Sequence, residues 1–228
     1  MALPLYLAQT RCEMGGNSPV PTFCAYMSVH FSPGGTGLSN FPEALPPGAM
    51  LILDDSTPIS GHDPERIVKE LSGLMEQHQC ESLLRDFQRP GYPALAALAQ
   101  AVSDTLPCSV GVSEIYAAGL SCPVFLSPVP PDRPLRKHLA PWTGREIWLE
   151  AALEGLKLTL TENGCATAPL HDFPEQGLKD SRLHCHYTIE SPATFHIWRT
   201  WDDLDALLAE AKIAGVTRAI GLWQELGD

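Results

Sequence analysis

The sequence predicts an α/β fold in which residues 1–228 form one reduced, irregular (β/α)8, or TIM-like, barrel with a small antiparallel β insertion at about 156–198. Three observations support this prediction: eight short apolar runs have strand character, helical segments separate several of them, and acidic residues recur where the runs end. The eight runs begin near residues 23, 50, 81, 109, 123, 146, 195 and 219. A doubly wound open sheet is the alternative topology.

The composition is that of a globular protein with an acidic bias. Hydrophobic residues make up 44% and charged residues 18% of the 228 residues, and the formal net charge is −12. Nucleic acid and anionic membrane surfaces would be repelled, so we expect neither as a partner, whereas a neutral or cationic ligand fits. No apolar run in the sequence approaches transmembrane length.

Cysteine usage and the amino-terminal segment both favour a cytoplasmic location. The seven cysteines are an odd number and include no C-x-x-C pair, which favours reduced thiols over a disulfide framework or a zinc site. The short apolar run at 2–8 has no basic residue before it and does not resemble a signal peptide.

The first quarter of the chain predicts two strands, a thin outer layer and one helix. Residues 1–22 predict an irregular lead-in and 23–31 a first strand, and the glycines and prolines of 32–48 argue that an outer helix is lost or reduced there. A buried strand at 50–55 ends in Asp54 and Asp55, which suit a loop cap and a ligand-binding site equally. Asp63 as N-cap and Pro64 in the first turn begin a helix that extends to about residue 79.

The segment 81–91 is the best candidate for a functional site. Because side chains alternate along a strand, Leu84, Asp86 and Gln88 should share one face. Proline and glycine at 90–91 end the strand. This leaves a carboxylate and an amide at the carboxyl end of a parallel strand, where α/β barrels hold their active sites.

The middle of the chain predicts more strands that end in polar side chains. We expect helix 92–106, strands 109–116, 123–128 and 146–151, and a brief helix at 135–139. Glu114 and Tyr116 end the first of these strands, and Glu150 ends the last. Two carboxylates that face each other across a barrel mouth could serve as acid and base, with their separation deciding the stereochemical outcome.

The pattern changes after Glu154. Residues 156–161 alternate, Asn163 and Gly164 predict a hairpin turn, and 165–169 return. A second alternating run at 183–190, a turn at 191–192 and a run at 195–200 follow. Thr200 and Asp203 predict a capping box that opens helix 201–213, which ends at Gly215. The last strand is expected at 219–226 and contains Trp223 and Glu225.

The segment Asp86-Phe87-Gln88-Arg89-Pro90-Gly91 resembles the Asp-Trp-Glu-Tyr-Pro-Gly segment of family-18 glycoside hydrolases, the chitinase group. Residues 50–91 are similar to that family's third to fourth strands, and 200–228 to its closing helix and last strand, so the resemblance covers about 70 residues in two blocks. It implies a TIM barrel with an oligosaccharide or other small-molecule ligand. It also implies that Trp223 forms the floor under the sugar and that Asp86 orients an acetamido group.

The departures from the family pattern concern catalysis. The signature Asp-x-x-Asp-x-Asp-x-Glu here becomes Glu81-x-x-Leu84-x-Asp86-x-Gln88. Gln88 stands where the family has the glutamate that protonates the leaving oxygen, and an amide has no such proton to give. The family's Tyr-Asp after its sixth strand has no counterpart in residues 125–128. The resemblance therefore implies broken hydrolase machinery with a surviving sugar floor.

Three hypotheses follow from these residues. The first is a glycan-binding, catalytically degenerate barrel with Asp86, Gln88, Trp223, Tyr116, Glu225 and Asp54 at its site. The second is an active glycosidase that uses relocated carboxylates at Glu114, Glu150 or Glu225. The third is a structural or regulatory barrel without a carbohydrate ligand.

Neither a metal nor a cofactor is expected. His184-x-His186 on one strand face, with His196 across a hairpin, could hold a metal, but alternating histidines are common on exposed sheets and no further ligand is placed. The sequence has no Gly-Lys-Ser/Thr phosphate loop and no Gly-x-Ser-x-Gly nucleophile elbow.

Overall fold

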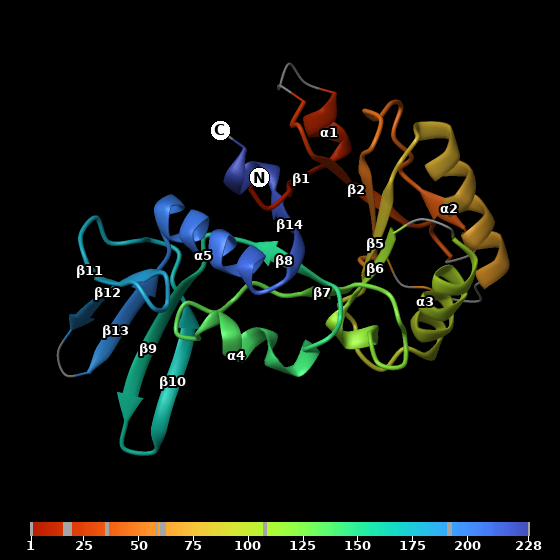
Figure 1. Cartoon of the computed structure of the whole chain (residues 1–228). Coiled ribbons are helices and arrows are strands. Elements are labelled where there is room, and N and C mark those ends of the chain that lie inside the picture. The colour runs from red at the N-terminus through yellow and green to blue at the C-terminus, as the bar shows by residue number, and fades with distance from the viewer. Residues whose placement is uncertain are drawn as a thin grey trace.

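The computed structural model describes residues 2–15, 20–34, 37–57, 59, 63–106, 109–190 and 193–227. Its centre is a closed barrel of parallel strands with helices outside it and a separate antiparallel sheet at one side (Figure 1). The barrel strands are β1 (Leu5–Gln9), β2 (Cys24–Phe31), β4 (Met50–Asp54), β5 (Ser82–Asp86), β6 (Ser109–Ser113), β7 (Val124–Leu126), β8 (Ile147–Ala151) and β14 (Val216–Leu222). The predicted α/β barrel is therefore confirmed.

The identity of two strands was wrong in the sequence-based prediction. β1 lies within the expected lead-in, and it closes the barrel by pairing in parallel with both β14 and β2. The run at 195–200 was counted among the eight barrel strands and also overlapped the expected insertion at 156–198; it supplies β13 (Thr194–Trp198) to the antiparallel sheet, so only its place in the insertion is correct. The last strand ends at Leu222, and Trp223 begins the short helix α6 (Trp223–Leu226).

Two apolar layers hold the barrel together. Inward-pointing residues pack into an inner cluster, which contains Tyr6, Ala8, Ala25, Met50, Ile52, Leu84, Phe125, Trp148 and Ile220. A larger cluster lies between the strands and the outer helices and includes Leu83 and Phe87. Leu83 and Leu84 of β5 thus point to opposite sides, as period-two alternation requires.

The outer layer is uneven. α2 (Pro64–His78) and α3 (Pro93–Thr105) cover one side of the barrel (Figure 1), and Asp63 caps α2 by accepting hydrogen bonds from the backbone N–H groups of Glu65 and Arg66. The remaining helices are α1 (Arg11–Met14), α4 (Leu135–Leu139), α5 (Trp201–Ile213) and the 3-10 turns η1 (Glu114–Tyr116) and η2 (Ala140–Trp142). Between β2 and β4, the described residues hold only the short strand β3 (Leu38–Ser39) and no helix, which confirms the reduced outer layer at 32–48.

The insertion between β8 and β14 is a five-stranded antiparallel sheet. Its strands, in spatial order, are β10 (Gly164–Pro169), β9 (Gly155–Thr161), β13, β12 (Cys185–Glu190) and β11 (Leu178–Asp180). The expected hairpin at 163–164 is present, with Gly164 at φ 132°, whereas the expected turn at 191–192 lies outside the described residues. No helix within the described ranges is both long enough and apolar enough to span a membrane.

Candidate functional site

Three carboxylates meet at the carboxyl end of the barrel. Asp54 ends β4 and Asp86 ends β5, and the two residues are direct partners in the parallel register of these strands. Asp54 lies two positions after the inward-pointing Ile52, and Asp86 lies two positions after the inward-pointing Leu84. Because side chains alternate along a strand, both carboxylates point inward as well. Glu150 stands on β8 in the same phase as the inward-pointing Trp148.

These carboxylates line a small hollow in the barrel mouth with a volume of about 60 Å³. The other residues that line it are Ala8, Met27, Ile52, Leu84, Phe125, Ile220, Gly221 and Leu222. Small-molecule pockets usually measure about 300–1,000 Å³. The hollow therefore admits one small chemical group, and a larger ligand would have to lie across the mouth.

Burial and mutual repulsion shift the ionisation of two of these acids. Burial raises the pKa of Asp86 and the neighbouring charges of Asp54 and Asp55 raise it further, against the opposing effect of a hydrogen bond from Gln88. Burial, followed by repulsion from Asp86, Glu154 and Glu225, raises the pKa of Glu150 to about 7. Glu150 can therefore carry or release a proton near neutral pH.

The loop after β5 is fixed by Asp55, a residue that the sequence left ambiguous. Asp55 is only 5% exposed, and its carboxylate accepts hydrogen bonds from the backbone N–H groups of Gln88, at 3.0 Å, and Arg89, at 2.9 Å. The Gln88 side-chain amide in turn donates to Asp86. Asp55 is thus a positioning residue that holds the amide of Gln88 beside the carboxylate of Asp86.

Glu114, Tyr116 and Glu225 are not among the residues that line the hollow. Glu114 begins η1 and accepts a 2.9 Å hydrogen bond from the Ser127 hydroxyl. The Tyr116 hydroxyl donates to the carbonyl of Arg89, so it supports the loop rather than the mouth. Glu225 accepts a hydrogen bond from the backbone N–H of Leu153.

Trp223 directly follows the carboxyl end of β14 and is not among the residues that line the hollow, so its role as a sugar floor stays a prediction. Its indole lies against Gly227 within the last turn of the chain, and Leu222 is the last residue of the chain to line the hollow. The floor under the carboxylates consists of inner-cluster side chains that include Leu84, Phe125 and Ile220. Sequence reasoning missed Phe125 and Ala8 because a short apolar strand carries no signal for the end of the barrel that its residues line.

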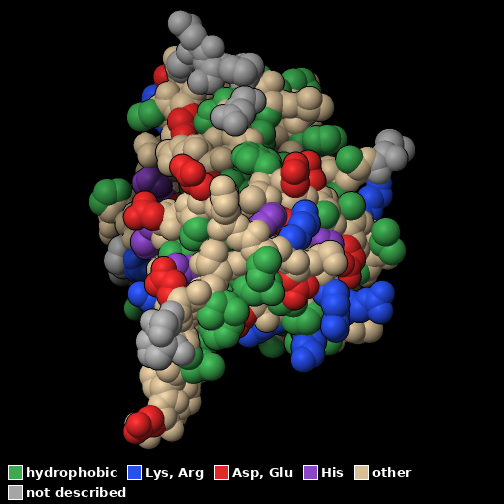
Figure 2. Space-filling view, turned by 90° about the vertical axis from the view of Figure 1, so that its left-hand side faces the viewer, with side chains coloured by type: hydrophobic (Ala, Val, Ile, Leu, Met, Phe, Trp, Pro, Cys, Tyr) green, Lys and Arg blue, Asp and Glu red, His purple; other side chains and the backbone are tan. Residues whose placement is uncertain are grey.

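The histidines of the insertion are paired with separate carboxylates. His186 Nδ1 lies 2.7 Å from Asp203 Oδ2, and His184 Nε2 lies 2.8 Å from Glu210 Oε2, both on α5. His184 precedes β12 and has a left-handed backbone with φ 51°, so the predicted His-x-His pair on one strand face is wrong. Figure 2 shows histidine, acidic and basic side chains intermixed on this side of the molecule.

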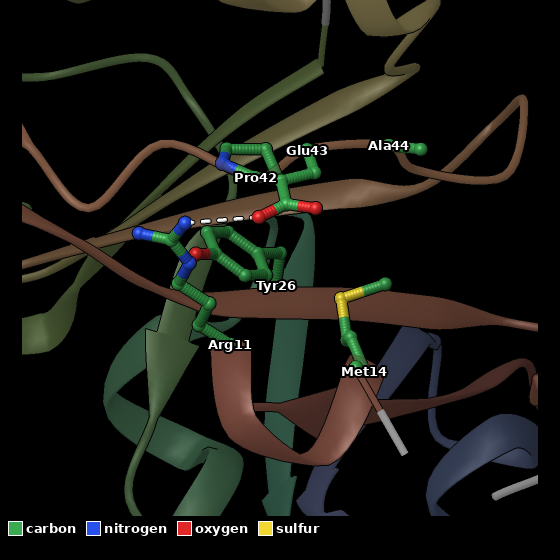
Figure 3. Close-up of a pocket in the computed structure, with 7 residues that line it drawn as sticks. Arg11, Met14, Tyr26, Pro42, Glu43 and Ala44 are labelled. Atoms are coloured by element: carbon green, nitrogen blue, oxygen red, sulfur yellow. Dashed lines mark hydrogen bonds and ion pairs between the residues drawn. The ribbon is translucent and has the colours of Figure 1, made fainter. Parts of the chain in front are cut away.

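A second hollow, of about 250 Å³, lies beside α1 on the outside of the barrel. Figure 3 shows Arg11 and Glu43 pointing toward each other near the ring of Tyr26, and their charged groups are 3.0 Å apart. Both side chains are more than half exposed, and such surface ion pairs contribute little. The hollow marks the place where the short α1 leaves the barrel thinly covered.

Comparison with known proteins gives matches in structure only. No protein-family model matches the chain, and no curated protein matches its sequence. The Bacillus cereus spore cortex-lytic enzyme SleL is similar with a TM-score of 0.59 and 11% identity, over 96% of this chain and 70% of that one.

Two plant proteins are similar over nearly their whole lengths. A GH18 chitinase mutant from Cycas revoluta, solved with (GlcNAc)4, has a TM-score of 0.61 and 11% identity over 96% of this chain and 94% of that one. A chitinase-like agglutinin from Robinia pseudoacacia has a TM-score of 0.60 and 13% identity over 95% and 93%. The chain therefore has the α/β-barrel fold of the family-18 glycoside hydrolases and of proteins similar to them.

Proposed function

We propose that this protein binds an oligosaccharide across the carboxyl end of its barrel and does not hydrolyse it by the substrate-assisted route of family 18. The observation that carries the proposal is the convergence of Asp54, Asp86 and Glu150 in the mouth of this fold. Carboxylates accept hydrogen bonds from sugar hydroxyl and amide groups, and barrel enzymes place their sites at this end. The solved neighbours include chitinases in complex with (GlcNAc)3 and (GlcNAc)4.

The absence of hydrolysis follows from the residue at position 88. A well-placed general acid contributes on the order of 10²–10⁴-fold in rate. Gln88 has no acidic proton, and its amide donates to Asp86. Binding can persist under these conditions because it requires only hydrogen bonds and apolar contacts.

One observation favours a second candidate, an active glycosidase with a relocated acid. Glu150 has a pKa of about 7 and lines the same hollow as Asp86. A buried carboxyl group that is partly protonated at neutral pH has the property required of a general acid, while a second carboxylate nearby can serve as nucleophile or base.

The test separates binding from turnover. Wild type, Gln88→Ala, Gln88→Glu and Glu150→Gln would be assayed on fluorogenic chitobiosides and titrated with an oligosaccharide panel by calorimetry. We expect wild type to bind without turnover. Wild-type turnover that survives Gln88→Ala but is lost in Glu150→Gln would support the second candidate. If wild type bound none of the oligosaccharides in the panel, the proposal would be refuted.

A cytosolic location also remains a proposal. Five of the cysteines at described positions are free thiols, namely Cys12, Cys24, Cys122, Cys165 and Cys185, which is the usual state in a reducing compartment. Detection of the protein in a secreted or periplasmic fraction would contradict it.

A further inference from the structure

The barrel mouth concentrates negative charge, and none of the described residues that line it is basic. Asp54 and Asp86 are direct neighbours in register on adjacent strands, an arrangement that is unfavourable for like charges. Glu150 lines the same hollow, and the residues that form its wall include no lysine, arginine or histidine. Among the described residues that line the hollow, no basic side chain neutralises the three acids.

The charged residues near the three acids already have partners elsewhere or are themselves acidic. Asp55 is occupied by the backbone N–H groups of the loop after β5, and Glu154 and Glu225 add further negative charge near Glu150. The cation that acts on Glu154 is Arg199. Its guanidinium is buried and donates to the carbonyls of Val129, Pro130, Leu183 and His184.

The size and walls of the hollow limit what can enter it. At about 60 Å³, it is much smaller than the roughly 300–1,000 Å³ of ordinary small-molecule pockets, so it suits a small group. An ammonium group contributes one non-hydrogen atom, whereas an acetamido group contributes four. Apolar side chains such as Ile52 and Phe125 form much of the wall, and in such surroundings an ion pair is stronger than in water.

We propose that the hollow receives the protonated amine of a deacetylated amino sugar, so that the protein prefers oligomers of glucosamine to oligomers of N-acetylglucosamine. This inference rests on the proposed oligosaccharide-binding function and names the ligand's charge. The amine donates its N–H groups to Asp54 and Asp86, and the sugar ring lies across the mouth. The acidic net charge of the chain, −12, attracts such a cationic oligomer as well.

A bound cation also changes the protonation of the mouth. Glu150 is partly protonated at neutral pH because its pKa is about 7. A nearby ammonium group favours the charged carboxylate, so binding should release part of a proton. A neutral N-acetylated ligand has no such effect, which gives a signal separate from affinity.

The experiment uses the full chain and two commercial probes, the glucosamine tetramer and the N-acetylglucosamine tetramer. Each is titrated by calorimetry in two buffers of different ionisation enthalpy at about pH 5.5, where the amines are already protonated and binding does not change their own protonation. The proteins are wild type, Asp86→Asn, Glu150→Gln and the control Asp205→Asn, which removes one charge from the exposed face of α5.

We expect wild type to bind the glucosamine tetramer at least tenfold more tightly, with an enthalpy that depends on the buffer. Asp86→Asn should weaken this binding about tenfold or more, since hydrogen bonds to charged groups are strong, and Asp205→Asn should change it less than twofold. Glu150→Gln should remove most of the buffer dependence, since Glu150 has the pKa closest to neutrality that the mouth provides, and this keeps the test decisive if Asp86→Asn does not fold.

Three results would overturn the inference. Equal or tighter binding of the N-acetylated tetramer would refute it and leave the proposed function intact. Equal losses in Asp86→Asn and Asp205→Asn would show that only the overall charge attracts the oligomer. Binding of neither tetramer, nor of any other oligosaccharide, would refute the proposed function itself.

Discussion

Replacing Glu150 by glutamine should stabilise the protein at alkaline pH. Burial and repulsion raise the pKa of Glu150 from 4.5 to about 7, so the folded state holds this proton more tightly than the unfolded state does. A group of this kind lowers stability as the pH rises from its unfolded value through its folded value. Glutamine has nearly the same shape but never acquires the charge.

The expected gain follows from the size of the pKa change. One pKa unit corresponds to about 1.4 kcal/mol, so ionising Glu150 costs the folded state up to about 3 kcal/mol above pH 8. Because water reaches the mouth, we expect about 1–3 kcal/mol in practice. At pH 5 the carboxyl group is neutral in the folded protein, and the gain should be well below this value.

Urea unfolding of wild type and Glu150→Gln at pH 5 and pH 8.5 measures the difference directly. Asp205→Asn serves as the control for the loss of one negative charge at the surface. A Glu150→Gln protein that is no more stable than wild type at pH 8.5, or that gains equally at both pH values, would refute the assignment of Glu150 to a buried, acid-rich mouth.

Two further variants test the supports of the site. Asp55→Ala should leave the backbone N–H groups of Gln88 and Arg89 without their acceptor, so the free energy of unfolding should fall by about 2–4 kcal/mol and oligosaccharide binding should weaken. A variant that unfolds in urea with the full stability of wild type would show that Asp55 does not hold the loop. Gly111→Ala places a methyl group against the ring of Trp148 inside the barrel and should cost about 1–3 kcal/mol, measured by thermal unfolding; an unchanged Tm would contradict the close packing of the inner cluster.

The fold class could be predicted because local patterns repeat along the chain. Strand runs, helix caps at Asp63 and Thr200, and the turn at Gly164 are all encoded within a few neighbouring residues, and the structure contains each of them. The placement of Asp86 at the carboxyl end of a strand required only the alternation of faces and a proline–glycine stop.

The errors arose where pairing between distant segments decides the structure. β1 is only five residues long, and its partners lie at 24–26 and 219–222, so nothing in its own sequence distinguishes it from a lead-in. β13 has the same alternation that a barrel strand would have, and only its antiparallel partners β9 and β12 assign it to the insertion.

The shape of the site could not be predicted from the sequence either. The register that sets Asp54 beside Asp86, and the small size of the hollow, both depend on how the barrel closes. The last strand was expected at 219–226, whereas β14 ends at Leu222 and the chain turns into α6 at Trp223. The floor role that the resemblance implies for Trp223 stays a prediction.

A crystal structure of the protein with the glucosamine tetramer tests the central claim most directly. The account predicts sugar density across the carboxyl end of the barrel, with the amino nitrogen of one glucosamine unit within hydrogen-bond distance of the carboxylate of Asp54 or Asp86. Density confined to the outer hollow beside Arg11 or to the insertion sheet, or an empty mouth at saturating tetramer, would contradict it.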